Sequence, residues 1–206
     1  MFLQDKFSSH KKFPENIPSS LTKISKIAWI HLMHGTILKS SFFQRPALIV
    51  AEQLIGCEIC REIDNTIQRY MILETEAYLG EEDLASHAHF GKTKRNEAMY
   101  ACGGIWYVYL CYGIHHMLNI VTGAENQPEA VLLRSITNYP GPGKLSHALN
   151  ISFKLNKQPC DPSSGLWIEA PQKVSKIVIE KNPRIGVHYA GTIWANKPYR
   201  FTAKNV

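Results

Sequence analysis

The sequence of 206 residues lacks any apolar run close to the roughly 20 residues that a helix needs to span a bilayer. Its most apolar N-terminal stretch, residues 24–33, is short and is interrupted by Lys26 and His31. The chain also lacks the patterns G-x-x-x-x-G-K-[ST] and G-x-S-x-G. These absences argue against a membrane partner, a P-loop nucleotide hydrolase and a serine hydrolase with a nucleophile elbow.

Cysteine is scarce, with five residues at positions 57, 60, 102, 111 and 160. The odd number, with no secretory signal before it, indicates a reducing, cytoplasmic location. Cys57 and Cys60 form a C-x-x-C pattern, but a zinc ribbon needs a second close pair, and the chain has none. Two interpretations stay open, a metal site and buried cysteines in a strand; the second is favoured because free cysteine is commonly buried.

The charge balance is modestly positive. Lys and Arg number 23 against 17 Asp and Glu, a formal net charge of +6. A positive excess suits an anionic partner such as nucleic acid. Many basic proteins bind no nucleic acid, so the charge alone decides little.

The chain divides near residue 35. Residues 1–35 are rich in Ser, Lys and Pro with little periodicity, which predicts an N-terminal extension that is disordered or loosely docked. Residues 36–206 contain neither an internal repeat nor a linker after residue 40 and are expected to form one domain.

The pattern after residue 40 predicts a mixed α+β domain in which strands dominate. A helix is expected after Pro46 and ends near Gly56, and a second short helix follows the turn Pro140-Gly141-Pro142-Gly143 over residues 144–149. Strands are expected over residues 57–63, 69–76, 106–112, 114–122, 130–136, 174–180 and 193–201. Asp64-Asn65 is expected to form one turn, and Tyr112-Gly113 the tip of a hairpin.

Glu76 is the first candidate for chemistry. It follows the apolar strand residues 70–73, with Glu74 on the same face two residues earlier. A carboxylate there is either a general base or an ordinary surface charge, and surface charge is the default because Glu is rarely buried. The local pattern does not decide between Glu74 and Glu76.

Aromatic residues gather around residues 100–112, and their alternation separates two faces. Tyr107 and Tyr109 share one face, whereas Trp106, Val108 and Leu110 share the other. One face can be core while the other is a stacking surface for an unstacked base. Aromatic strand residues are usually core, so both interpretations stay open here.

Two histidine pairs, His87 with His89 and His115 with His116, are candidate metal ligands. Neither lies near the H-x-E and C-x-x-C set of zinc deaminases, so the non-metal interpretation is favoured. The segment that ends in Gly143-Lys144 could place backbone N–H groups and a lysine against a phosphate. As a single signal it is weak, because most such segments are only turns.

Taken together, these segments resemble the alkyladenine, or methylpurine, DNA glycosylase family. The matching stretches occur in the family's order over about residues 38–201. They are ETEAYLG (74–80), DLASH (83–87), RNEAMY (95–100), GGIWYVYLCYG (103–113), LN (118–119), VLLR (131–134), GPGKL (141–145) and PRIGV (183–187). Any one could arise by chance, whereas the ordered set is a strong signal.

The resemblance implies a role for each matching residue. Glu76 matches the glutamate that deprotonates the attacking water, Arg134 an arginine near that water and the target phosphate, and Val187 a residue whose backbone carbonyl positions the water. Tyr112 matches the tyrosine that enters the duplex and fills the gap left by the flipped base. The residues that match the base pocket are Tyr78, His87, Tyr109 and Asn119, and Asn119 matches the asparagine that hinders normal guanine. Lys144 matches a contact to the DNA backbone.

The resemblance also implies a fold and an activity. The fold is a curved, mainly antiparallel sheet with peripheral helices and a protruding β-hairpin. The activity is hydrolysis of the N-glycosidic bond of alkylated or deaminated purines in double-stranded DNA, which leaves an abasic site without strand cleavage. The family needs no metal or cofactor and acts as a monomer. Two alternatives remain, a non-catalytic nucleic-acid-binding module and a metal-dependent hydrolase that uses His87 and His89.

Overall fold

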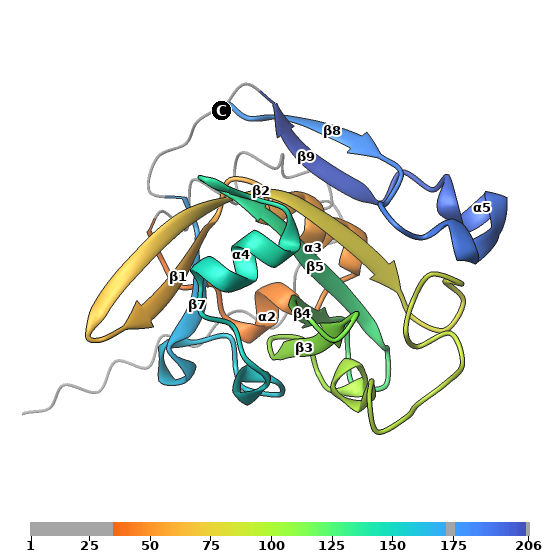
Figure 1. Ribbon diagram of the computed structural model, residues 1–206, viewed down its shortest axis with the longest axis horizontal. Helices are drawn as coiled ribbons and strands as arrows, with labels where there is room; N and C mark the ends of the chain where they lie inside the picture. Colours follow the sequence, from red (N-terminus) through yellow and green to blue (C-terminus); the bar gives the residue numbers. More distant parts are fainter. Residues whose placement is uncertain (1–34, 172–175, 205–206) are drawn as a thin grey trace, which may run out of the picture.

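The strands of the described residues form one nine-stranded sheet in which the paired strands run antiparallel (Figure 1). The computed structural model describes residues 35–171 and 176–204. The strands are β1 (Glu58–Ile63), β2 (Thr66–Leu79), β3 (Trp106–Cys111), β4 (His115–Thr122), β5 (Glu129–Ile136), β6 (Tyr139–Pro140), β7 (Leu166–Glu169), β8 (Val178–Asn182) and β9 (Arg200–Lys204). The sheet order is β3-β4-β5-β2-β1-β7, with β6 on β5, β9 on β2 and β8 on β9.

Short helices surround this sheet. The α-helices are α2 (Ser40–Phe43), α3 (Ala47–Leu54), α4 (Pro142–Ala148) and α5 (Gly191–Ala195), and the 3-10 helices are η2 (Glu97–Tyr100), η3 (Phe153–Leu155), η4 (Pro162–Ser164) and η5 (His188–Ala190). Helix α3 buries Ala47, Val50, Ala51 and Leu54 against the sheet, next to β2 and β5. The predicted α+β fold with a mainly antiparallel sheet is therefore confirmed.

Strand β2 is the central element. Its first half pairs with β1, and its second half pairs with both β5 and β9. Asp64 and Asn65 join β1 to β2 with left-handed φ values of 49° and 59°, as a tight hairpin turn requires. A register irregularity over residues 72–75 bends the strand there. Residues 74–76 consequently have neighbouring strands on both sides.

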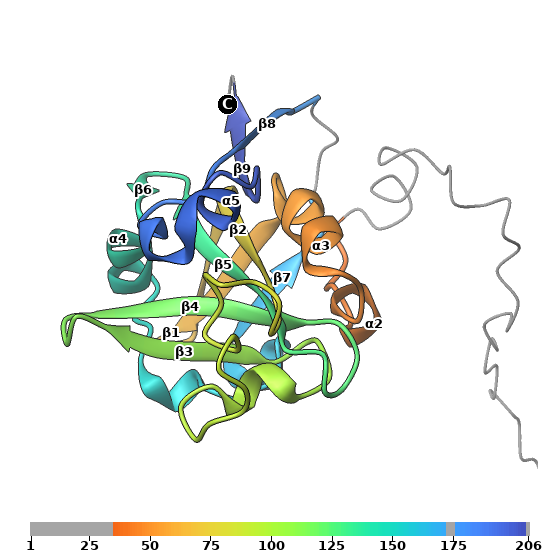
Figure 2. The same ribbon diagram turned by 90° about the vertical axis from the view of Figure 1, so that its right-hand side faces the viewer.

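The β3–β4 hairpin projects from the body of the molecule (Figure 2). Trp106 and Val108 are buried in the main core, whereas Tyr107 and Tyr109 belong to a separate cluster on the opposite face. The predicted alternation is thus confirmed. At the tip, Tyr112 takes a left-handed φ of 51° and is 93% exposed.

Three predicted elements were wrong in their extent. Strand β2 continues to Leu79, so Glu76 lies within it and not at its end. Residues 193–201 are not one strand, because residues 191–195 form helix α5 and Pro198 separates that helix from β9. The strand expected over residues 174–180 is β8, which begins at Val178; residues 172–175 lie outside the described residues.

The sequence pattern missed β7, whose four residues are all buried and show no alternation. The extension predicted over residues 1–35 lies, apart from Gly35, outside the described residues and stays a prediction. Within residues 35–171 and 176–204, none of the helices has the length and apolar character needed to cross a bilayer.

Candidate active site

Glu76 is fully buried at 0% exposure, which rules out the default interpretation as a surface charge. Both carboxylate oxygens have partners. Oε1 accepts a hydrogen bond from the backbone N–H of Ile185 at 2.8 Å, and Oε2 accepts one from the hydroxyl of Tyr78 at 3.0 Å. Nη1 of Arg134 lies 3.3 Å from Oε2. The carboxylate is therefore held in one orientation by groups from three segments of the chain.

Arg134 contacts both Glu74 and Glu76, the two glutamates between which the sequence pattern did not decide. It lies on β5 beside β2, and its Nε lies 3.3 Å from Oε1 of Glu74. Glu74 also contacts Nη1 of Arg200 at 3.0 Å. Glu74 is thus shared between two arginines, whereas Glu76 contacts Arg134 and adjoins the aromatic residues.

The pKa of Glu76 is raised from its ordinary value, chiefly because burial disfavours the charged form. The positive charge of Arg134 acts in the opposite direction, as do the hydrogen bonds from Ile185 and Tyr78, while the negative charge of Glu74 adds to the rise. A carboxylate with a raised pKa is a stronger base than an exposed one, provided that it ionises at the working pH.

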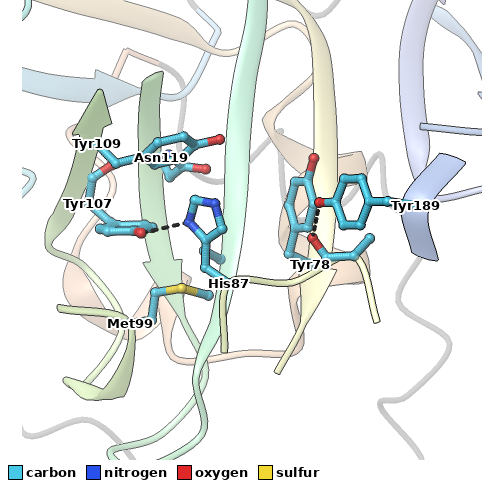
Figure 3. A pocket seen from close by; sticks show the side chains of 9 residues that line it. Tyr78, His87, Met99, Tyr107, Tyr109, Asn119 and Tyr189 are labelled. Carbon is cyan, nitrogen blue, oxygen red and sulfur yellow. Dashed lines mark hydrogen bonds between the residues drawn. The ribbon is translucent and has the colours of Figure 1, made fainter. Parts of the chain in front are cut away.

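An aromatic pocket lies next to Glu76. Figure 3 shows the imidazole of His87 between two groups of rings, with Tyr107 and Tyr109 on one side and Tyr78 and Tyr189 on the other. The His87 and Tyr109 ring centroids are 4.4 Å apart, and Nδ1 of His87 lies 2.8 Å from the Tyr107 hydroxyl oxygen. The residues that line the pocket are Tyr78, Ala85, His87, Met99, Tyr107, Tyr109, Asn119, Ala130 and Tyr189. This arrangement suits a flat ring better than an extended chain.

The pocket is uncharged near neutral pH. Desolvation, followed by the positive charge of Arg95, lowers the pKa of His87, so its imidazole is neutral there. Burial raises the pKa values of Tyr78, Tyr107 and Tyr109, and their hydroxyl groups stay protonated. The pocket walls therefore do not repel a cationic aromatic ligand.

The pocket opens into a wider groove that leads to the hairpin tip. The groove is lined by Tyr78, His87, Arg95, Tyr109, Cys111, Tyr112, Met117, Leu132, Arg134, Pro142, Ile185, Gly186, Val187 and Tyr189. Tyr112 and Arg134 thus border one continuous surface with the pocket entrance. Asn119 lies deeper, where its Nδ2 donates to the carbonyls of Tyr107 and Met117 at 3.2 Å each.

Two candidate residues, Val187 and Lys144, have less support from the structure than the others. The backbone carbonyl of Val187 accepts a hydrogen bond from the N–H of Ala190 at 3.0 Å, so one of its two acceptor positions is already used. Lys144 is exposed on α4 and does not line the pocket or the groove, although Pro142 of the same helix does. Lys144 therefore lies at the edge of the arrangement.

Sequence reasoning missed Tyr189 and Met99 as pocket residues, and it gave Tyr107 no role beyond the candidate stacking face that it shares with Tyr109. The position of Tyr107 in the pocket could have been predicted, because alternation placed its side chain on the same face as that of Tyr109. Tyr189 is 71% exposed and reaches the pocket from η5, with its hydroxyl donating to the carbonyl of Ala85 at 3.0 Å. No spacing in the sequence indicates that contact.

Among the described residues, no three His, Cys, Asp or Glu side chains converge in a way that could hold a metal ion. His87 contacts Tyr107, whereas Nδ1 of His89 contacts the carbonyl of Glu81 at 3.0 Å. Cys57 and Cys60 are buried, as favoured from the sequence, and burial raises the pKa of Cys60 to about 12. The Cys60 thiol is therefore protonated at neutral pH.

The family model described as methylpurine-DNA glycosylase matches residues 41–139 and 138–206. The chain is also similar to three proteins that are each named "Putative 3-methyladenine DNA glycosylase". The protein from Psychrobacter cryohalolentis is 40% identical, with 80% of this chain and 94% of that protein covered. The corresponding values are 41%, 82% and 90% for Myxococcus xanthus, and 39%, 82% and 93% for Methanocella arvoryzae.

Proposed function

Because the chain belongs to the methylpurine-DNA glycosylase family, and is thus a DNA repair hydrolase acting on N-glycosyl bonds, we propose that it flips alkylated or deaminated purines out of duplex DNA and releases them. The observation that carries this proposal is the fully buried carboxylate of Glu76, hydrogen-bonded to a wall of the aromatic pocket. A base inside a duplex must leave the stack before such a pocket can enclose it.

The aromatic pocket supports recognition of damaged purines. Stacking of a base on aromatic side chains contributes about 1–3 kcal/mol per base. A purine alkylated at N3 or N7 carries positive charge, which electron-rich rings favour by about 1 kcal/mol. The neutral imidazole of His87 adds no opposing charge. Asn119 lies deep in the pocket and is proposed to exclude guanine by hindering the exocyclic amine of that base.

Glu76 is proposed to act on both partners of the reaction. Departure of the base leaves a sugar with oxocarbenium character, which an ionised carboxylate stabilises. The same carboxylate takes the proton of the water that attacks C1′. Arg134 favours the ionised form of Glu76 and borders the groove, where a phosphate of the target nucleotide would lie. The Val187 carbonyl is proposed to orient the water, and Lys144 to contact the DNA backbone.

The proposed enzyme leaves the DNA strand intact. Strand cleavage by a glycosylase needs an amine that forms a Schiff base with the sugar. None of the described residues that line the pocket and groove is a lysine. The expected product is therefore an abasic site and a free base. We further propose that the enzyme acts as a monomer.

The test is a panel of labelled duplexes, each with one lesion: 3-methyladenine, 7-methylguanine, hypoxanthine or 1,N6-ethenoadenine. We expect free base by chromatography from at least one duplex, with strand breaks only after alkali. Binding of damaged duplexes without base release would identify a binding module instead. Strand breaks before alkali would contradict the absence of strand cleavage.

Tyr112 is expected to stabilise the flipped state by filling the vacated stack, since it is 93% exposed at the hairpin tip. We expect Tyr112→Asn to weaken binding to a lesion duplex by about tenfold, in line with the energy of stacking on one aromatic ring. Asn tolerates the left-handed backbone of this position, so the change removes the ring and leaves the turn. Affinity is measured by fluorescence anisotropy.

Phe90→Ala is the matched control, because Phe90 is an equally exposed aromatic residue of a different loop, at 91%. Its affinity for the lesion duplex should stay near that of the wild type. Equal losses in the two variants would remove Tyr112 from the intercalating role.

A further inference from the structure

A fully buried ion pair lies beside the candidate active site and takes no part in the proposed reaction. The side chains of Asp83 and Arg184 are both 0% exposed. The guanidinium meets the carboxylate with two nitrogens: Nη1 contacts Oδ2, and Nη2 donates to Oδ1 at 2.8 Å. Such a paired geometry fixes the orientation of both groups.

This pair joins three segments that build the site. Nη1 of Arg184 also donates to the carbonyl of Ala77, between Glu76 and Tyr78 on β2, at 2.9 Å. Asp83 accepts hydrogen bonds from the backbone N–H groups of Leu79 at 3.1 Å and Ala85 at 3.0 Å. The guanidinium lies over the Tyr78 ring, with its carbon 4.7 Å from the ring centroid. One ion pair thus connects β2, the segment that leads to His87, and the loop after β8.

That loop supplies a direct partner of Glu76. Ile185, the residue after Arg184, donates its backbone N–H to Oε1 of Glu76 at 2.8 Å. The Ile185 side chain is 52% exposed and cannot anchor the loop, whereas Arg184 is buried. The loop has further supports, a hydrogen bond from Arg200 Nε to the Pro183 carbonyl at 2.8 Å and the buried Val187. Arg184 adds a side-chain hydrogen bond from this loop to the backbone of the strand segment that carries Glu76 and Tyr78.

We propose that Asp83 and Arg184 are positioning residues that aim the Ile185 N–H at Glu76 and so hold the catalytic carboxylate in one orientation. This rests on the proposed function for its catalytic meaning. Stability alone is a weak reason for such a pair, because burying two charges costs about as much as their attraction returns. Fixed geometry across three segments is what the pair provides.

The effect should be visible in the titration of Glu76. Its hydrogen bond from Ile185 lowers the pKa that burial raises, so loss of this bond shifts the ionisation to higher pH. Other groups act on the same carboxylate, and all of them except the substituted Arg184 stay in place in the test. They are Glu74 and Tyr78 on β2, Arg134 on β5, Tyr109 on β3, and Arg184 and Tyr189 after β8.

The direct test is Arg184→Lys, which keeps the charge but has one nitrogen in place of the guanidinium fork. We expect the single-turnover rate of base release to fall about tenfold on the acid limb of the pH–rate profile and to recover at higher pH, as a raised pKa of the base requires. Ile185→Pro removes the N–H at an exposed side chain and should shift the acid limb in the same direction. Arg69→Lys, in the distant ion pair with Glu169, is the control and should leave the profile unchanged.

A second readout does not need activity. In amide NMR spectra of the wild type, the Ile185 N–H should titrate with Glu76, and Glu76→Gln should abolish that titration. In Arg184→Lys, and in Asp83→Asn, the transition should move to higher pH or disappear. If the wild type releases no base, the proposed function fails, and this titration alone decides the positioning role.

The proposal is overturned if Arg184→Lys lowers the melting temperature but leaves both the pH profile and the Ile185 titration unchanged. Failure of both Arg184→Lys and Asp83→Asn to fold would mark the pair as purely structural and overturn it equally.

Discussion

Arg134→Gln is expected to lower the single-turnover rate of base release at neutral pH by about 10- to 100-fold, because a nearby opposite charge strongly favours the ionised carboxylate. Arg134 is the largest influence that lowers the pKa of Glu76 against the effect of burial. Without it, the pKa of Glu76 rises further, less of the carboxylate is ionised at a given pH, and the acid limb of the pH–rate profile moves to higher pH. The measurement is that profile, with enzyme in excess over a duplex carrying one lesion.

Arg69→Gln is the matched control, because Arg69 pairs with Glu169 on β7 and, among the described ion pairs, makes none with Glu76. Its profile should stay close to that of the wild type. Recovery of the Arg134→Gln rate at high pH would show that Arg134 acts through the ionisation of Glu76. A rate that stays low at every pH would indicate an additional contact with the substrate phosphate. An unchanged profile would contradict the proposed role of Arg134 in the ionisation of Glu76.

The local parts of the fold were predictable from the sequence. The Asp64-Asn65 turn, the strands it joins and the β3–β4 hairpin depend on alternation and on residues that favour left-handed backbone. Strand β7 was missed because it is buried along its whole length and shows no polar face. Helix α5 was missed because its apolar residues, Ile193 and Trp194, were assigned to the following strand.

The candidate site was only partly predictable, because it depends on contacts between residues far apart in the sequence. The resemblance identified Glu76 and its aromatic neighbours, but the residues alone favoured a surface charge. What makes Glu76 different is burial between β5 and β9, which depends on strands far apart in the sequence. The contact between Asp83 and Arg184 joins residues 101 positions apart, and no local pattern indicates such a pairing.

Glu76→Gln is expected to lower the rate of base release by about 1,000-fold, within the range for removal of a general base. Gln keeps the size of the side chain and can still accept the hydrogen bond from Ile185. It can neither take a proton from water nor stabilise a cationic sugar by charge. Binding of the lesion duplex should be retained, because the groove, the aromatic pocket and Tyr112 are unchanged. The measurement is the single-turnover rate of base release.

Glu169→Gln is the matched control for this change. Glu169 is another buried carboxylate with an arginine partner, 7% exposed, and it lies on β7, away from the pocket. The same chemical change there should leave base release at the wild-type rate. A loss in both variants would indicate a general effect on folding.

The most direct measurement follows free base and bound duplex in the same reaction, with wild-type protein, Glu76→Gln and Glu169→Gln each in excess over one lesion duplex. We expect all three proteins to bind the duplex and only Glu76→Gln to fail to release the base on the wild-type time scale. Release by Glu76→Gln at the wild-type rate would contradict the central claim that this buried carboxylate activates the water.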